Sequence, residues 1–416
     1  MMKRYTPLCV PAVLFFGLLI LTACSPIIVK TDKNYIKDRY DFLPNESLPE
    51  MHVEPFPVAN VDYEHKNQMV FVNFSDSKGK LAIKEISNTV WDIAIVAGDE
   101  PDSDGNGSIY MVTNSGDYGE NTFILPFADG RTMESYRGSN ISIVRQVCFK
   151  KGETDLSPYQ NDPDSGSTPV ANPFYEALKN GKKYFLRVGK NFDDAELFVI
   201  WFDVMSSVAA GQTYTLHVKP VTLTEINGSK NITGFGTEYT LTKRIDNDYS
   251  FNYIKLLKTS ARVLNTDDGI PKKNEWQLLF IRTHIYSKEM GEVFGNDGII
   301  GSSSILTNSP GGVQTAALYG WDFPEVTNVP ADKHFKRIID GVGKGFANLL
   351  NDDPEKRRKA WYYGLNMPPT YYLNRNTYVF KWETAEGVKK YAKFRPGSFY
   401  GPGREKFYVQ FRYAVK

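Results

Sequence analysis

Apolar residues alternate with polar ones along much of the chain, in short runs that end at turn-forming residues. Successive side chains on a β-strand point to opposite faces of a sheet, so a period of two is typical of strands. The clearest runs are also rich in β-branched and aromatic residues, which favour strands. They predict strands at 70–74, 182–188 and 406–413. We therefore expect a mostly β fold, of the β-rich α+β class.

A helical period stands out at one place, where apolar residues recur at spacings of three and four. This spacing places them on one face of a helix, so it predicts a helix over residues 332–350. Three glycines inside the same segment weaken the helix, because glycine has a low helix propensity. The apolar residues are Phe335, Ile338, Ile339, Val342, Phe346 and Leu349, and the glycines are Gly341, Gly343 and Gly345.

The first residues predict export and a lipid anchor. Lys3 and Arg4 precede an almost continuous apolar run at 8–21, which is too short for a standard membrane span and typical of a cleaved signal. The run ends in Leu-Thr-Ala-Cys, which resembles the lipobox of bacterial lipoproteins, so we expect residues 1–23 to be removed and Cys24 to be acylated, with palmitate or a similar chain. The alternatives are an ordinary secretory signal with a chance cysteine, and a retained membrane helix.

Residues 24–60 carry Pro, Asn, Asp and Lys with little periodicity, so we expect them to form a tether between the lipid and the folded part. Acyl chains hold a protein firmly to a bilayer because each buried methylene contributes about 0.8 kcal/mol. The expected location is the outer membrane. The sequence leaves open which face of that membrane carries the protein.

Charge and cysteine content narrow the function classes. The chain has 49 basic and 48 acidic residues, so its charge does not favour nucleic acid. Of the three cysteines, Cys9 leaves with the signal and Cys24 is acylated, which makes Cys148 the one thiol of the mature chain. Cys148 lies in an apolar strand-like run, and we interpret it as a buried structural residue.

Four sequence features occur twice in the same order. Each copy has an apolar strand that begins with tryptophan, a strand that ends in Thr-Asn-Ser, a strand pair around a turn, and an aromatic alternating strand. We interpret the chain as a tandem duplication, with a first repeat at 61–225 and a second repeat at 226–416. The paired features are Trp91 and Trp276, 111–116 and 305–312, 184–200 and 378–394, and 213–218 and 407–415.

Each repeat resembles the HmuY family, haem-binding surface lipoproteins of Bacteroidota. The resemblance covers most of 65–416 through short motifs separated by divergent stretches. It implies two tandem HmuY-like β domains that capture haem for iron acquisition. The motifs are Val70-Phe71-Val72-Asn73-Phe74-Ser75, Lys78-Gly79-Lys80, Trp91-Asp92-Ile93-Ala94-Ile95 and Thr113-Asn114-Ser115-Gly116 in the first repeat, and 378–394 and 407–413 in the second.

The resemblance also implies where haem iron would be coordinated. The family uses two side chains, His or Met, and one of them follows a tryptophan and precedes the C-terminal hairpin. Here Met367 follows Trp361 at that place, and His334 lies earlier in the chain at the family's separation. A His/Met pair suits haem iron. The alternative is a solvated histidine and a core methionine, and the first repeat offers only Met133 between residues 116 and 184.

Other chemistry has weaker support. Asp102–Gly107 resembles the start of a calcium loop, but Thr113 stands where an EF-hand needs glutamate, so a turn explains the segment better. No zinc spacing is present, and no metal site is expected. No G-x-S-x-G elbow or phosphate-binding glycine loop occurs, so an enzyme is the least supported class. The histidines are His52, His65, His217, His284 and His334.

We therefore expect an outer-membrane lipoprotein that captures haem or another tetrapyrrole. Its partners would be the membrane, haem or a host haemoprotein, and an outer-membrane receptor. The alternative is a surface protein- or glycan-binding structural module that has lost haem binding, a role that tyrosine-rich strands suit.

Overall fold

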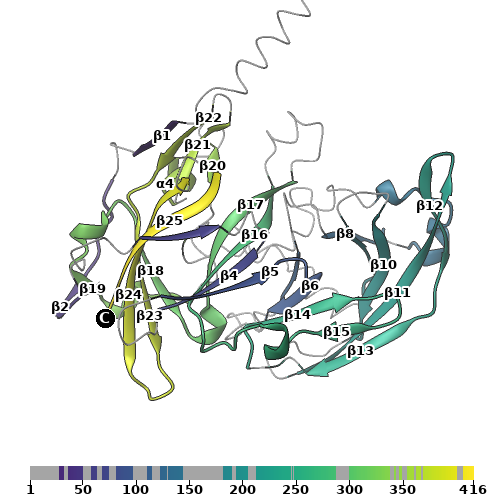
Figure 1. Ribbon diagram of the computed structural model, residues 1–416, viewed down its shortest axis with the longest axis horizontal. Helices are drawn as coiled ribbons and strands as arrows, with labels where there is room; N and C mark the ends of the chain where they lie inside the picture. Colours follow the sequence, from purple (N-terminus) through teal and green to yellow (C-terminus); the bar gives the residue numbers. More distant parts are fainter. Residues whose placement is uncertain are drawn as a thin grey trace, which may run out of the picture.

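A computed structural model describes most residues between 28 and 416. These residues form a stack of four β-sheets, with two inner sheets packed face to face and one outer sheet on either side (Figure 1). The mostly β class is confirmed, and α4 (Pro354–Lys359) is the single α-helix within those ranges. The ranges are 28–31, 36–49, 58–62, 68–74, 81–96, 110–114, 122–128, 130–143, 181–189, 194–204, 212–244, 246, 248–286, 299–337, 342, 346–348, 354–359, 362–366, 369–400 and 406–416.

The two inner sheets have four strands each. The first inner sheet has the order β15-β14-β6-β7, and the second inner sheet has the order β17-β16-β4-β5. Every neighbouring pair is antiparallel. Their bounds are β4 Gln68–Asn73, β5 Ala82–Ser87, β6 Ile93–Val96, β7 Tyr110–Thr113, β14 Phe251–Leu256, β15 Ala261–Val263, β16 Leu278–Tyr286 and β17 Ile299–Thr307.

The outer sheets each cover one inner sheet. The first outer sheet runs β12-β11-β10-β9-β8, with β13 also paired to β11, and the second outer sheet runs β18-β23-β24-β25-β3. The strands predicted at 70–74, 182–188 and 406–413 are confirmed as β4, β9 and β25. The bounds are β3 Val58–Asp62, β8 Thr122–Pro126, β9 Tyr184–Val188, β10 Glu196–Phe202, β11 Thr213–Ile226, β12 Ser229–Phe235, β13 Tyr239–Arg244, β18 Gln314–Leu318, β23 Thr377–Glu383, β24 Lys389–Tyr400 and β25 Lys406–Val415.

The inner strands are buried on both faces, which explains their continuous apolar sequences. On β4, Val70 and Val72 face the second outer sheet, while Met69 and Phe71 face the first inner sheet. The middle of the stack is a core that the two inner sheets share. Its members are Met69, Phe71, Ile86, Trp91, Ala94, Phe251, Tyr253, Leu264, Ile270, Trp276, Leu279, Ile281 and Leu306.

Strands from the two predicted repeats are exchanged between the inner sheets. The hairpin β4–β5 of the first repeat pairs with β16 of the second, and β14–β15 of the second repeat pairs with β6 of the first. The outer sheets are mixed as well. β13 of the second repeat pairs with β11 of the first, and β3, which crosses the boundary between residues 24–60 and the first repeat, pairs with β25. Each of the four sheets therefore contains strands from both sides of residue 225.

The two exchanged strand pairs, β6 with β14 and β4 with β16, make equivalent hydrogen bonds. The Asp92 amide donates to the Ile254 carbonyl at 2.9 Å, and the Gln277 amide donates to the Val72 carbonyl at 2.8 Å. Two side chains make the equivalent return contact, because Asp92 Oδ2 accepts from the Leu256 amide at 2.8 Å and Gln277 Oε1 accepts from the Phe74 amide at 2.7 Å. The two predicted repeats thus make equivalent contacts in the stack.

The Thr-Asn-Ser landmarks position the tryptophan loops. Asn114 Nδ2 donates to the Trp91 carbonyl at 2.7 Å, and Asn308 Nδ2 donates to the Trp276 carbonyl at 2.8 Å. The Trp91 indole Nε1–H finds the fixed partner that a buried tryptophan needs, the Asn88 side chain at 2.8 Å.

Two predictions need correction, the N-terminal tether and the helix. Residues 24–60, expected to be a tether, contain β1 (Ile28–Thr31), β2 (Phe42–Ser47) and β3, which pair with β22, β19 and β25. The helix expected over 332–350 is wrong. That segment has a 3-10 turn, η9 (Asp332–His334), and a short strand, β20 (Phe346–Asn348), because Phe335 is buried against the outer sheet and the glycines disfavour a helix.

A fifth, small sheet lies at one end of the second outer sheet (Figure 1). Its order is β1-β22-β21-β20, with β21 at Tyr362–Asn366 and β22 at Pro369–Leu373. β1 is parallel to β22, and β20 is parallel to β21.

Candidate functional site

Residues 36–49 form a strap across the exposed face of the second outer sheet, and this strap defines the candidate site. β2 pairs with β19 (Asn328–Pro330), and Leu48 donates its amide to the Thr327 carbonyl at 2.8 Å. The Tyr40 hydroxyl donates to the Ala317 carbonyl on β18 at 2.8 Å. The strap therefore closes a separate core on this face, made of Leu48, Ala316, Leu318, Val326, Val329, Phe335, Val379 and Tyr391.

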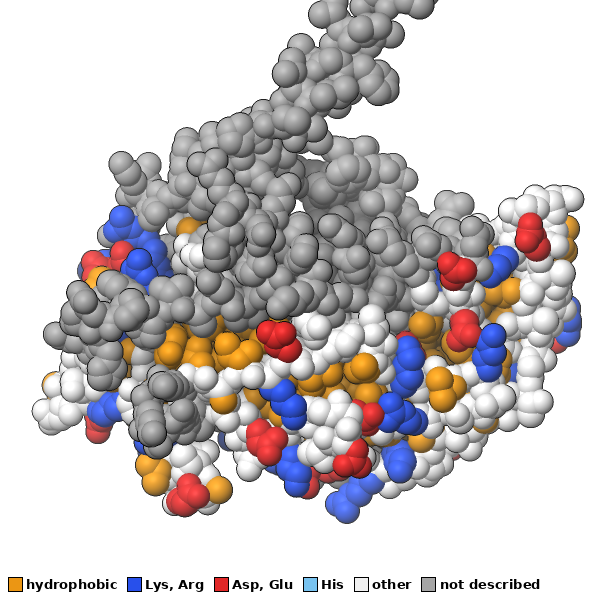
Figure 2. Space-filling view, in the orientation of Figure 1, with side chains coloured by type: hydrophobic (Ala, Val, Ile, Leu, Met, Phe, Trp, Pro, Cys, Tyr) orange, Lys and Arg blue, Asp and Glu red, His pale blue; other side chains and the backbone are white. Residues whose placement is uncertain are grey.

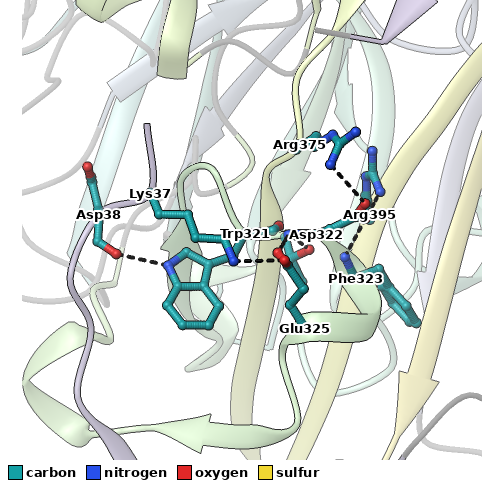
Figure 3. Close-up of polar contacts among 9 residues, drawn as sticks. Lys37, Asp38, Trp321, Asp322, Phe323, Glu325, Arg375 and Arg395 are labelled. Atoms are coloured by element: carbon teal, nitrogen blue, oxygen red, sulfur yellow. Dashed lines mark hydrogen bonds and ion pairs between the residues drawn. The ribbon is translucent and has the colours of Figure 1, made fainter. Parts of the chain in front are cut away.

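Trp321 lies directly under the start of the strap (Figure 3). Its Nε1–H donates to the Asp38 carbonyl at 2.9 Å, and the Lys37 ammonium lies 4.8 Å from the ring centroid. Lys37 Nζ also pairs with Glu325 at 2.7 Å. At Gly320 the backbone φ is +78°, and an added Cβ would collide with the Ile36 carbonyl, so glycine is required where the strap crosses.

Asp322, next to Trp321, forms ion pairs with two guanidinium groups (Figure 3). Arg395 forms an ion pair with Asp322 Oδ1, and Arg375 Nη1 lies 3.9 Å from Oδ2. The same carboxylate accepts the Phe323 amide at 2.7 Å and so caps the short 3-10 helix η8 (Phe323–Glu325). One acidic side chain thus orders a turn and holds two arginines.

Arg395 is the most perturbed basic group of this site. Burial, together with the smaller effect of the like charge of Arg412 directly opposite on β25, lowers its pKa to about 10. Within the described part of the structure, the buried Arg395 Nε has no hydrogen-bond partner. A guanidinium with a buried, unused donor beside a second arginine is suited to an anion.

The predicted haem ligand His334 lies at the other edge of the strap. Its Nε2 accepts the Asp41 amide at 3.0 Å, and its ring meets Tyr40 edge to face at 5.2 Å. Burial, with a smaller contribution from Lys333, lowers the pKa of His334 despite the nearby Asp41. The ring is thus neutral and its Nε2 lone pair is already in use. Met367 lies outside the described residues, so its pairing with His334 stays a prediction.

A second polar cluster lies on the first outer sheet and carries no motif in the sequence. His217 Nδ1 is 2.7 Å from Glu238 and its Nε2 is 2.7 Å from Asp203. The His217 ring stacks on Trp201 at 4.9 Å, and Lys183 Nζ lies 5.0 Å from the same indole. The pairing of β10 with β11 places Trp201 and His217 side by side, which no local sequence pattern reveals.

Of the other predicted site residues, Met133 is described by the structure. Met133 is half-buried in η2 (Met133–Tyr136), packed against the first outer core. Cys24, Cys148 and Asp102–Gly107 lie outside the described residues. Among the residues that the structure describes, no group of three His, Cys, Asp or Glu side chains could hold a metal ion.

The surface gives no strong steering field on the face shown in Figure 2, where acidic and basic side chains are interspersed. No helix in the described ranges is both long and apolar enough to cross a bilayer.

No protein-family profile matches the chain, and no curated protein or solved structure is significantly similar to it.

Proposed function

We propose that this chain is a lipid-anchored binding protein of the outer membrane, held by acyl chains at Cys24. The basic start, the short apolar run and the Leu-Thr-Ala-Cys sequence support the anchor. The binding face is the outer face of the second outer sheet, where the strap crosses it.

The observation that carries this proposal is the arginine arrangement around Asp322. Arg375 and Arg395 share one carboxylate, and Arg412 lies opposite Arg395 in the strand register. Like charges opposite each other on a sheet repel each other, and an anion added beside Asp322 would reduce this repulsion. A ligand with carboxylate or phosphate groups supplies that anion, and the Trp321 indole offers an adjacent flat surface.

Haem is the specific ligand that we test first. It is flat and carries two carboxylates, which suit the tryptophan and the arginines. His334 lies on the same face and would serve as an axial ligand, with Met367 as the second. Binding through His334 Nε2 requires the strap to release the contact between that nitrogen and the Asp41 amide.

The test is a haem titration of the chain that starts after Cys24, followed by the Soret absorbance. We expect a saturable shift that is lost in His334→Ala and in Met367→Ala. His217→Ala is the matched control, because it removes a histidine from the opposite outer sheet, and it should bind like the wild type. A shift that survives in His334→Ala and Met367→Ala discards this ligand pair, and no shift with oxidised or reduced haem ends the haem proposal.

The second candidate is a protein- or glycan-binding structural module. The observation that favours it is the state of His334, whose Nε2 is engaged by the strap rather than open to a ligand. In this case the strap stays closed, wild-type absorbance is unchanged by haem, and the arginines act on an anionic group of a larger partner.

A further inference from the structure

We propose that His217 is a proton-dependent clamp on the first outer sheet, which holds β13 against β11 when the imidazole is charged and loosens it when the imidazole is neutral. His217 lies on β11, in the first predicted repeat, and β13 belongs to the second. The clamp therefore acts at a junction where the two predicted repeats share a sheet. It does not depend on the ligand proposed for the second outer sheet.

Both ring nitrogens of His217 lie at hydrogen-bonding distance from a carboxylate. Nδ1 is 2.7 Å from Glu238 Oε1, and Nε2 is 2.7 Å from Asp203 Oδ1. An ionised carboxylate only accepts hydrogen bonds, and a neutral imidazole has one N–H donor and one acceptor nitrogen. Both contacts are hydrogen bonds only when both nitrogens carry a proton. The geometry therefore describes an imidazolium.

The two carboxylates belong to the strands on either side of β11. Asp203 directly follows β10, and Glu238 directly precedes β13. In the strand register, His217 is opposite Trp201 on β10 and opposite Thr240 on β13. One charged ring thus ties the end of one neighbouring strand and the start of the other to β11.

Acidic groups dominate the surroundings of the ring among the residues that the structure describes. Asp203 and Glu238 contact it directly, whereas Lys183 reaches only the indole on which the ring stacks, and Lys219 lies two residues further along β11. Burial opposes the charge, but the two carboxylates outweigh it and raise the pKa of His217. The proton is lost as the pH rises through this raised pKa, so the clamp is closed at low pH and open at high pH.

A neutral ring cannot keep both contacts. One of its nitrogens then presents a lone pair to a carboxylate oxygen, and two acceptors repel each other. Asp203 is also held by its backbone, because its amide donates to the Thr215 carbonyl on β11 at 3.1 Å. We therefore expect Glu238 to move away, and this frees the residue from which β13 begins.

The second outer sheet provides an internal reference. Its strand order β18-β23-β24-β25-β3 corresponds to β8-β9-β10-β11-β13 of the first outer sheet. Counted from the tyrosine that opens each matched strand pair, Trp201 corresponds to Arg395 and His217 to Arg412. Arg412 is paired with β3, as His217 is with β13. Arginine does not titrate in the range where histidine does, so the junction of β3 with β25 should not respond to pH in this way.

The experiment follows amide hydrogen exchange of the full chain by mass spectrometry, from about pH 6 to about pH 9. Rates are converted to protection factors, which remove the effect of pH on intrinsic exchange. We expect the protection of β13, residues 239–244, to fall several-fold over this range, while that of β3, residues 58–62, stays constant. Constant protection of β13, or an equal loss at β3, overturns the inference.

Glu238→Gln is the matched variant. Its side-chain amide can donate to the acceptor nitrogen of a neutral ring, so the contact with His217 survives loss of the proton. The protection of β13 in this variant should be the same at both ends of the pH range. If β13 loses as much protection in Glu238→Gln as in the wild type, the contact between His217 and Glu238 is not the clamp.

Discussion

The indole of Trp91 packs edge to face against the ring of Tyr253, with ring centroids 5.0 Å apart, and so joins the first repeat of the sequence to the second. The equivalent pair is Trp276 with Phe71, at 5.3 Å, which joins the repeats in the other direction. Both tryptophans are fully buried in the core shared by the inner sheets. Through this reciprocal packing the two predicted repeats share one hydrophobic core.

Removing either tryptophan should therefore weaken the whole stack. We expect Trp91→Ala and Trp276→Ala each to lower the free energy of unfolding by about 3–5 kcal/mol, because each leaves a large cavity in the shared core. Denaturant unfolding followed by circular dichroism should show one transition in each variant. Two transitions, with one at the wild-type midpoint, would mean that the repeats unfold separately.

Asp92 and Gln277 test the matched contacts of the exchange. Each side chain accepts one buried backbone amide, from Leu256 and from Phe74. Asp92→Ala and Gln277→Ala should each cost about 1–3 kcal/mol in unfolding free energy, because a buried N–H is left without its acceptor. Asp92→Asn is the control, because an amide oxygen can accept the backbone N–H, as the Gln277 side chain does from Phe74. It should cost clearly less than Asp92→Ala in the same denaturation experiment.

Much of this stack could be predicted from the sequence, and the exchange could not. Continuous apolar runs such as 70–74 indicate strands buried on both faces, and the paired Trp and Asn landmarks indicate a repeat. Yet β4 and β14 have similar patterns, so each is equally suited to pair within its own repeat or with the other. Hydrophobic periodicity shows which face of a strand is buried, but it does not show which strand lies beside it. Only the three-dimensional register shows that β4 pairs with β16.

The candidate site was less accessible to sequence reasoning for a related reason. His334 was identifiable by its separation from Met367, but its contact with Asp41 depends on a strap that begins far away in the chain. Arg395 and Arg412 lie opposite each other only because β24 pairs with β25, and Trp201 meets His217 only because β10 pairs with β11. Contacts between distant strands leave no local signal.

The two histidines should respond to pH in opposite directions. Burial opposes the charge on His217, but Glu238 and Asp203 outweigh it and raise its pKa above the ordinary value near 6.5. Its stabilising effect is therefore complete below about pH 6.5 and is lost as the pH rises through the raised pKa. The pKa of His334 is lowered, so its effect is complete above about pH 6.5 and is lost as the pH falls through the lowered pKa.

Unfolding free energies of His217→Gln and His334→Gln, measured from about pH 5 to pH 8, check both signs. The difference between wild type and His217→Gln should shrink as the pH rises. The difference between wild type and His334→Gln should grow over the same range. Parallel profiles for the two variants would contradict these assignments.

Gly320 offers a selective way to loosen the strap. Gly320→Ala places a methyl group on the Ile36 carbonyl, whereas Gly387→Ala has a similar positive φ, +76°, and open space around it. Both substitutions strain the backbone, by about 1–2 kcal/mol. Only Gly320→Ala should expose residues 36–49, which limited proteolysis with mass spectrometry detects. Equal cleavage of the strap in both variants would show that Gly320 does not govern it.

The central claim, exchange of strands between the repeats, is tested most directly by cutting the chain between them. Asn227 and Gly228 form the exposed turn between β11 and β12, with φ of 53° and 73°, and this turn accepts an inserted protease site. After cleavage, gel filtration should show both fragments eluting together at the size of the intact chain, and separating only when the protein is unfolded. Fragments that elute apart under native conditions, each folded, would contradict the exchange.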